Sequence, residues 1–358
     1  MSDRAYFKNN NFDLVRLLAA SQVAVLHSIS HLGVDAGPLT TVIGYFPGVP
    51  AFFFISGFLI SASWERNPRL REFGINRALR IFPALWGVLI ATLVSLFVFY
   101  EPARLFASPG KLALWITCQA TFFPQWNPDF LRGYGVGVVN GSLWTIPVEM
   151  SFYVATPALY WLMKRARSAT MVLAIAIVAS FAVQYGFTGQ TGFDGTALLV
   201  RKLVKASFIP WIGMFCMGVL VQRNIDRIYP LIAGRAVHLL ALYAAISVFT
   251  HHFELYPLLR GHRNSMGMVN YIVYCALVLS VAYTKRDWSD RLLRRNDISY
   301  GMYILHMPVI NAVHEQGVRG WGAFFLAVGC TTALATASWL IIEKPALRLK
   351  PRPMYQHG

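Results

Sequence analysis

Residues 12–31 read FDLVRLLAASQVAVLHSISH, and this stretch decides how the rest of the chain is interpreted. It is apolar enough to enter a bilayer, yet it contains Arg16 and His27. Because a helix turns ~100° per residue, their spacing puts both side chains on one face, roughly 16 Å apart along the axis. An ionisable residue inside a membrane helix costs roughly 3 kcal/mol and usually faces a polar interior. The pair therefore predicts a helix that lines a polar passage across most of the membrane.

The composition is that of a membrane protein. The chain has 358 residues, of which 56% are apolar and 13% charged, with a mean hydropathy of +0.48. A soluble domain contains about 25% charged residues. Apolar runs of nearly 20 residues recur from end to end, as in proteins that cross a bilayer many times. We therefore expect an all-α integral membrane protein, with one membrane domain over residues 1–358 and no extra soluble domain.

The apolar runs predict a bundle of about ten transmembrane helices. The segment 112–123 is also apolar, but it is short and Pro124 ends it, so we expect an interfacial or re-entrant piece. The ten expected spans are 12–32, 45–64, 81–100, 142–163, 168–187, 203–221, 232–250, 266–284, 298–316 and 321–342.

Arginine and lysine in the connecting loops predict the orientation. With the N-terminus in the cytoplasm, inner segments hold 21 of these residues and outer loops hold 8. The bias predicts that both termini are cytoplasmic. An eleventh span at 112–123 would place every later loop on the opposite side of the membrane and remove the bias.

The formal net charge of +16 does not indicate nucleic acid binding, because the basic residues lie in short loops between spans. The four cysteines are scattered in apolar segments without metal-ligand spacing and are interpreted as packing residues. His31 follows His27 at a spacing that could hold a metal ion, but no third ligand is evident, so no metal is expected.

Glu149 is the only acidic residue inside the apolar body of any expected span. It lies roughly 9 Å below the outer surface, and His27 lies roughly 8 Å below the same surface. A carboxylate at this depth could fix the imidazole tautomer and stabilise an imidazolium, as general-base catalysis requires. The alternative is a buried structural hydrogen bond between the two.

Two arginines precede the third span. Arg77 and Arg80 lie three residues apart on a helix that starts at the cytoplasmic side. Because guanidinium groups bind phosphate through paired hydrogen bonds, they could hold a phosphorylated cytosolic ligand. The alternative is ordinary positive-inside bias. Arg16 has an alternative as well, since it could extend inward beside Asp13.

Two further motifs have both a structural and a functional interpretation. In FFFISGFLIS, residues 52–61, Ser56 and Gly57 permit close helix packing. His306 lies near mid-membrane, two residues before Pro308, which frees a backbone carbonyl close by. A packing histidine is the alternative there.

Taken in order, these motifs resemble the acyltransferase-3 family of ten-span membrane O-acyltransferases, which modify bacterial surface glycans. Arg16 and His27 match the family's arginine, ten residues and histidine. The resemblance continues through FFFISGFLIS, RALRIFPALW, SLWTIPVEMSFY and SYGMYILHMP, and it runs from Phe12 to Pro345. The chain departs from the family at IPVEM, where many members have serine–valine–glutamate.

The resemblance implies acyl transfer, usually of acetyl, from cytosolic acyl-CoA to a hydroxyl of an extracytoplasmic or lipid-linked saccharide in the bacterial cell envelope. His27 would be the catalytic base and Glu149 its partner. The expected donor-binding residues are Arg16, Ser56, Arg77, Arg80 and His306. The protein would be a multi-pass protein of the bacterial inner membrane, with acyl-CoA, a glycan or glycolipid acceptor and membrane lipid as partners. Nucleic acid is not expected as a partner.

A transporter or flippase for a polar or lipid-linked solute is the alternative function. Transporters often have repeated halves and helices broken in corresponding positions. The sequence contains neither feature in recognisable form, which favours the enzyme.

Overall fold

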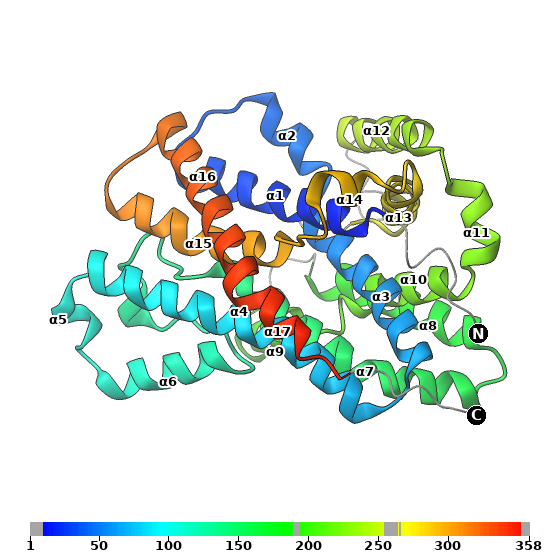
Figure 1. Ribbon diagram of the computed structural model, residues 1–358, viewed down its shortest axis with the longest axis horizontal. Helices are drawn as coiled ribbons and strands as arrows, with labels where there is room; N and C mark the ends of the chain where they lie inside the picture. The colour runs from blue at the N-terminus through cyan, green and yellow to red at the C-terminus, as the bar shows by residue number, and fades with distance from the viewer. Residues whose placement is uncertain (1–9, 189–193, 254–263, 265, 352–358) are drawn as a thin grey trace. The chain divides into compact units, whose positions relative to one another are not determined.

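A computed structural model describes residues 10–188, 194–253, 264 and 266–351, and every regular element within them is a helix (Figure 1). The helices are α1 (Phe12–His31), α2 (Pro38–Gly44), α3 (Gly48–Arg66), α4 (Leu70–Phe99), α5 (Pro102–Leu105), α6 (Pro109–Ala120), two short 3-10 helices (Asp129–Leu131 and Gly141–Trp144), α7 (Thr145–Arg165), α8 (Ala169–Val183), a π-helix (Gln184–Thr188), α9 (Gly195–Ala206), α10 (Ile212–Arg223), α11 (Ile225–Ile232), α12 (Ala236–His252), α13 (Met268–Tyr283), α14 (Trp288–Leu293), α15 (Ser299–Glu315), α16 (Gly320–Ser338), a π-helix (Trp339–Glu343) and α17 (Lys344–Arg348).

The all-helical, membrane-spanning class is confirmed, but the count of ten spans is not. Among the described residues, five helices are long and apolar enough to cross a membrane. A sixth is possible if α11 and α12, which are bent by 86° at their junction, form one span. Five of the basic residues behind the expected orientation lie outside the described residues: Arg4, Lys8, Arg260, Arg263 and Arg352. The cytoplasmic position of both termini stays a prediction.

One expected span, 203–221, is broken in the structure. α9 ends at Ala206 and α10 starts at Ile212, so α10 has 12 residues and a length of about 18 Å. Pro210 lies in the break, where it cannot donate a backbone hydrogen bond and restricts the residue before it. Its carbonyl oxygen accepts a hydrogen bond from the Gln184 side chain.

Contacts divide the chain into two compact units, each built from three separate stretches of sequence. The first unit contains the chain up to Ala19, Gly44–Pro68 and Val148–Asp297, and the second contains Ala20–Ile43, Arg69–Pro147 and the chain from Ile298. The expectation of one membrane domain stays a prediction.

In the first unit, α3 packs directly on α10 through glycines. A Cβ atom on Gly57 would lie 1.9 Å from the carbonyl oxygen of Phe215, and one on Gly218 would lie 2.1 Å from that of Phe54. The two backbones therefore touch at these positions, which explains the expected small-residue packing at Gly57. The rings of Phe152 and Phe215 stack beside this contact, with centroids 4.8 Å apart.

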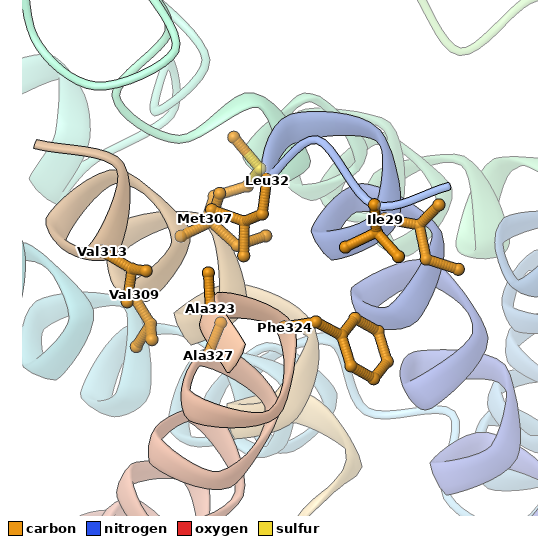
Figure 2. Close-up of a cluster of buried hydrophobic side chains, with 10 residues drawn as sticks. Ile29, Leu32, Met307, Val309, Val313, Ala323, Phe324 and Ala327 are labelled. Carbon is orange, nitrogen blue, oxygen red and sulfur yellow. The ribbon is translucent and has the colours of Figure 1, made fainter. Parts of the chain in front are cut away.

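In the second unit, the C-terminal half of α1 packs on α15 and α16. Ile29 faces Phe324, and Leu32 lies against Met307 (Figure 2). We call this group the α1–α15–α16 cluster; its buried members are Ile29, Leu32, Val34, Met307, Val309, Ile310, Val313, Ala323, Phe324 and Ala327. Because burial contributes roughly 25 cal/mol per Å² of apolar surface, this cluster stabilises the position of α1 beside α15.

Also in the second unit, α6 lies alongside α4 (Figure 1). Its 12 residues are too few to cross a bilayer as an α-helix, as expected for the segment before Pro124. The Trp86 indole donates a hydrogen bond to the carbonyl oxygen of Ala120 at 3.0 Å. An open, largely apolar groove of about 370 Å³ lies between the two helices next to Trp86.

Candidate active site

His27 and His306 meet inside the second unit. Nδ1 of His27 lies 2.9 Å from Nε2 of His306, and the ring centroids are 5.1 Å apart. His306 is buried, with 1% of its surface exposed, whereas His27 is partly accessible. The rings lie next to the α1–α15–α16 cluster, since Met307 and Ile29 follow them closely in sequence. The candidate base therefore has a fixed, hydrogen-bonded position and an accessible side.

His306 makes a second polar contact within its own helix. Its Nδ1 lies 3.3 Å from the carbonyl oxygen of Met302, one turn earlier in α15. The sequence predicts that His306 binds the donor, and that role stays a prediction. The structure shows that His306 contacts His27. The signal available in the sequence was a second histidine inside an expected span, near mid-membrane.

Residues 134–140, which precede α7, are held on α15 by hydrogen bonds with side chains of α15. The Asn311 side chain accepts from the Val136 N–H at 2.9 Å and donates to the carbonyl oxygens of Val138 and Val139 at 3.0 and 2.8 Å. Glu315 accepts from the Gly135 N–H. Gly135 has a φ of +58°, and a Cβ there would lie 2.1 Å from the Asn311 side-chain oxygen. Only glycine fits this turn.

The same segment is fixed at two further points. Tyr134 lies 2.6 Å from the Ser95 hydroxyl, and its burial raises the pKa of its phenol to about 12. Asn140 donates to the carbonyl oxygen of Ile304 at 2.8 Å, and Tyr303 donates to that of Ser142 at 3.1 Å. This network was not expected from the sequence, where its signals were the glycines at 135 and 137 and the asparagines at 140 and 311.

Glu149 lies on α7 in the first unit, where its carboxylate accepts a hydrogen bond from the hydroxyl of Tyr153, one turn later. His27 belongs to the second unit. The pairing of Glu149 with His27 stays a prediction.

Arg16, in the first unit, forms an ion pair that the sequence did not reveal. Its Nη1 lies 2.7 Å from Oδ2 of Asp297, whose side chain is 8% exposed, and 3.9 Å from Asp13. Asn11 fixes this end of α1, because it donates to the carbonyl oxygens of Thr284 and Lys285 at 2.9 and 3.0 Å. The only sequence signal for Asp297 was an acidic residue at the edge of the span that begins at 298.

The other expected donor-binding residues lie on two helices. Arg77 lies over the ring of Phe73 at 5.6 Å, and Arg80 lies over that of Tyr300 at 6.0 Å, all within the second unit. Ser56 lies on α3, next to the Gly57 contact. Their binding roles stay predictions. Within the part of the chain that the structure describes, no three His, Cys, Asp or Glu residues are grouped closely enough to hold a metal ion.

These features define a helical membrane protein with a hydrogen-bonded pair of histidines, one buried and one partly accessible. The chain matches the Acyltransferase domain family, Acyl_transf_3, over residues 9–343, and it belongs to this family. It is therefore an acyltransferase, as the resemblance implied.

The chain is similar to three curated proteins, two of which are named as O-acetyltransferases. It is 30% identical to Nodulation protein 10 of Rhizobium leguminosarum bv. viciae, over 95% of this chain and 94% of that protein. It is 26% identical to an O-acetyl transferase of Shigella phage Sf6, over 94% of this chain and 96% of that protein. It is 24% identical to the peptidoglycan O-acetyltransferase OatA of Listeria monocytogenes, over 84% of this chain and 51% of that protein. The chain thus spans about half the length of the Listeria relative. No solved structure matches the chain significantly.

Proposed function

We propose that this multi-pass membrane protein transfers an acetyl group from cytosolic acetyl-CoA to a hydroxyl of an extracytoplasmic or lipid-linked saccharide. The names of the phage and Listeria relatives support acetyl as the acyl group and a cell-envelope glycan as the acceptor. The proposed location is the bacterial inner membrane, since a cytosolic donor and an outer acceptor require a protein that crosses it.

The observation that carries this proposal is the 2.9 Å contact between His27 and His306 on helices fixed by a shared apolar cluster. A histidine that is oriented by a neighbour and partly accessible is suited to general-base catalysis. His27 removes the proton from the acceptor hydroxyl, and the oxygen attacks the thioester carbonyl. The carbon–sulfur bond then breaks, and the departing CoA thiolate takes the proton from His27. The products are the O-acetyl ester and free CoA.

Other residues have supporting roles in the proposal. Arg77 and Arg80 bind phosphates of CoA, because the N–H groups of a guanidinium donate paired hydrogen bonds to phosphate oxygens. Arg16 and Ser56 contact the donor along its path through the protein. Glu149, which is hydrogen-bonded by Tyr153, stabilises the cationic form of His27. The α1–α15–α16 cluster beside the two histidines limits the access of water, which would otherwise hydrolyse the thioester.

Radiolabelled acetyl-CoA tests the proposal in membranes from cells with and without the protein. We expect label in the saccharide fraction, release of that label by mild base as for an ester, and loss of incorporation in His27→Ala. General-base catalysis typically contributes 10²–10⁴-fold, so transfer should fall by at least ~10²-fold. The amount of folded variant is checked by size-exclusion chromatography. Near-normal transfer by His27→Ala would refute the role of His27, and no incorporation by the wild-type protein would refute the donor.

A further inference from the structure

The contacts of His306 restrict which nitrogen of each imidazole carries a proton. A carbonyl oxygen can only accept a hydrogen bond, so the Met302 contact requires the proton of His306 to be on Nδ1. A neutral imidazole has one N–H, and Nε2 of His306 is then an acceptor. The nitrogen opposite it, Nδ1 of His27, must therefore be the donor.

The opposite assignment is less favourable. If His306 donated from Nε2, its Nδ1 lone pair would face the lone pairs of the Met302 oxygen at 3.3 Å. That arrangement replaces an attraction by a repulsion inside a buried site, where leaving a polar group unsatisfied costs roughly 1–3 kcal/mol. Both contacts are satisfied together in one arrangement only.

We propose that His306 is a positioning residue that fixes the tautomer of His27, so that Nε2 of His27 is the basic nitrogen of the acyltransferase. The chain of contacts runs from the Met302 carbonyl through His306 to Nδ1 of His27. This inference rests on the proposed function of His27 as the base, but the tautomer itself does not depend on activity.

The hydrogen bond between His27 and His306 is kept when His27 accepts a proton. The added proton resides on Nε2, and Nδ1 continues to donate to Nε2 of His306, now from a cation. Hydrogen bonds from charged donors are roughly twice as strong as neutral ones, so the contact strengthens as charge develops. His306 therefore orients the imidazole of His27 without adding a second charge to the site, while stabilisation of the imidazolium by a carboxylate is the role proposed for Glu149.

Nitrogen-15 NMR of the purified protein with labelled histidine tests the tautomer directly. The His27 signals are assigned by their loss in His27→Gln. We expect protonated Nδ1 and unprotonated Nε2 on His27 in the wild-type protein. In His306→Leu we expect the proton to move toward Nε2, the nitrogen that neutral histidine side chains favour in water. A wild-type His27 with its proton on Nε2 would overturn the proposal, whether or not the protein is active.

Kinetics separate positioning from a general structural role. His306→Leu should lower kcat about 10²-fold with the KM for acetyl-CoA changed less than about threefold. His306→Gln, whose amide oxygen can accept from His27, should recover about tenfold of that loss. His314→Gln is the matched control on the same helix and should keep wild-type kcat. Equal kcat in the wild-type and His306→Leu proteins would refute the inference while leaving His27 as base; an inactive wild-type protein would refute the proposed function alone.

Discussion

At the scale of single residues, Arg16 has a structural partner that changes how it is interpreted. Its guanidinium lies 2.7 Å from the largely buried carboxylate of Asp297, and only 20% of the Arg16 side chain is exposed. Removing one partner of a buried pair is costly, typically 3–5 kcal/mol, because the other charge stays buried alone. Arg16 therefore stabilises the fold, and any contact with the donor is made by a side chain that is already held.

A double-mutant cycle on this ion pair tests the stabilising role. We expect Arg16→Ala and Asp297→Ala each to lower the free energy of unfolding by about 3 kcal/mol, and the double variant to lose about 1–3 kcal/mol less than the sum. Thermal unfolding in detergent micelles measures each variant. Asp13→Ala is the control and should change stability by less than about 1 kcal/mol, since its side chain is 47% exposed. Strict additivity of the two single losses would contradict the coupling.

Arg77 and Arg80 give a second prediction at this scale. Replacing both with glutamate should raise the KM for acetyl-CoA by about 10–100-fold, because each charged hydrogen bond to phosphate contributes roughly 1.5–3 kcal/mol. Arg71→Glu is the control, an exposed arginine earlier in the same helix, and its KM should stay near wild type. Initial rates of CoA release over a range of acetyl-CoA concentrations measure the effect. An unchanged KM in the double variant would show that these arginines serve membrane orientation.

The spacing of Arg16 and His27 could be interpreted from sequence because helix periodicity is local. Their partners could not, since His306 and Asp297 lie 279 and 281 residues away along the chain. Pairing over such distances depends on how helices pack, which apolar patterns do not specify. The histidines and arginines could therefore be identified from the sequence, whereas the contact between His306 and His27 could not.

At the scale of helices, the contact between α3 and α10 depends on the absence of side-chain atoms. A methyl group on Gly57 would come within 1.9 Å of the Phe215 carbonyl oxygen, and the neighbouring atoms belong to backbone that cannot rotate away. The two helices would have to separate. Overpacking of this kind typically costs 1–3 kcal/mol.

Gly57→Ala tests this close approach. We expect a loss of at least about 1–3 kcal/mol in the free energy of unfolding, seen as a lower thermal unfolding midpoint in detergent. Gly74→Ala is the matched control, because Gly74 is also helical and a Cβ there meets no atom within 4 Å. That control should be neutral or stabilising by up to about 1 kcal/mol. A Gly57→Ala protein as stable as wild type would show that α3 and α10 do not touch in this way.

Helix boundaries also show where sequence patterns fail. The expected span 12–32 became α1 with nearly the same limits, because its apolar run has no internal break. The expected span 232–250 starts later, at Ala236, since Gly234 adopts a φ of +76° and the chain turns between α11 and α12. Hydropathy measures which residues prefer an apolar environment, whereas single prolines and glycines decide where a helix stops.

At the scale of the whole molecule, orientation is the property that rests most heavily on sequence. The bias of loop arginines and lysines predicts that residues 33–44 are outside and residues 164–167 are inside. The orientation of the later part of the chain depends on whether α9 and α10 together cross the membrane, since neither helix alone reaches about 30 Å.

Cysteine labelling tests that orientation. In a variant whose four cysteines are replaced by alanine, single cysteines are introduced as Asp35→Cys, Arg167→Cys, Lys202→Cys and Arg227→Cys, all exposed positions. A membrane-impermeant maleimide should label the first and third in intact cells, and the second and fourth only after permeabilisation. Labelling of Lys202→Cys and Arg227→Cys from the same side would contradict a crossing by α9 and α10.

The fastening of residues 134–140 to α15 limits how this protein can be recombined with its relatives. Asn311 and Glu315 hold that segment, and His306 lies on the same helix. A chimera that exchanged α15 alone would separate the side chains at 311 and 315 from the backbone groups with which they form hydrogen bonds. Residues 127–145 and 299–315 should therefore come from the same parent protein in any chimera, so that neither segment is exchanged without the other.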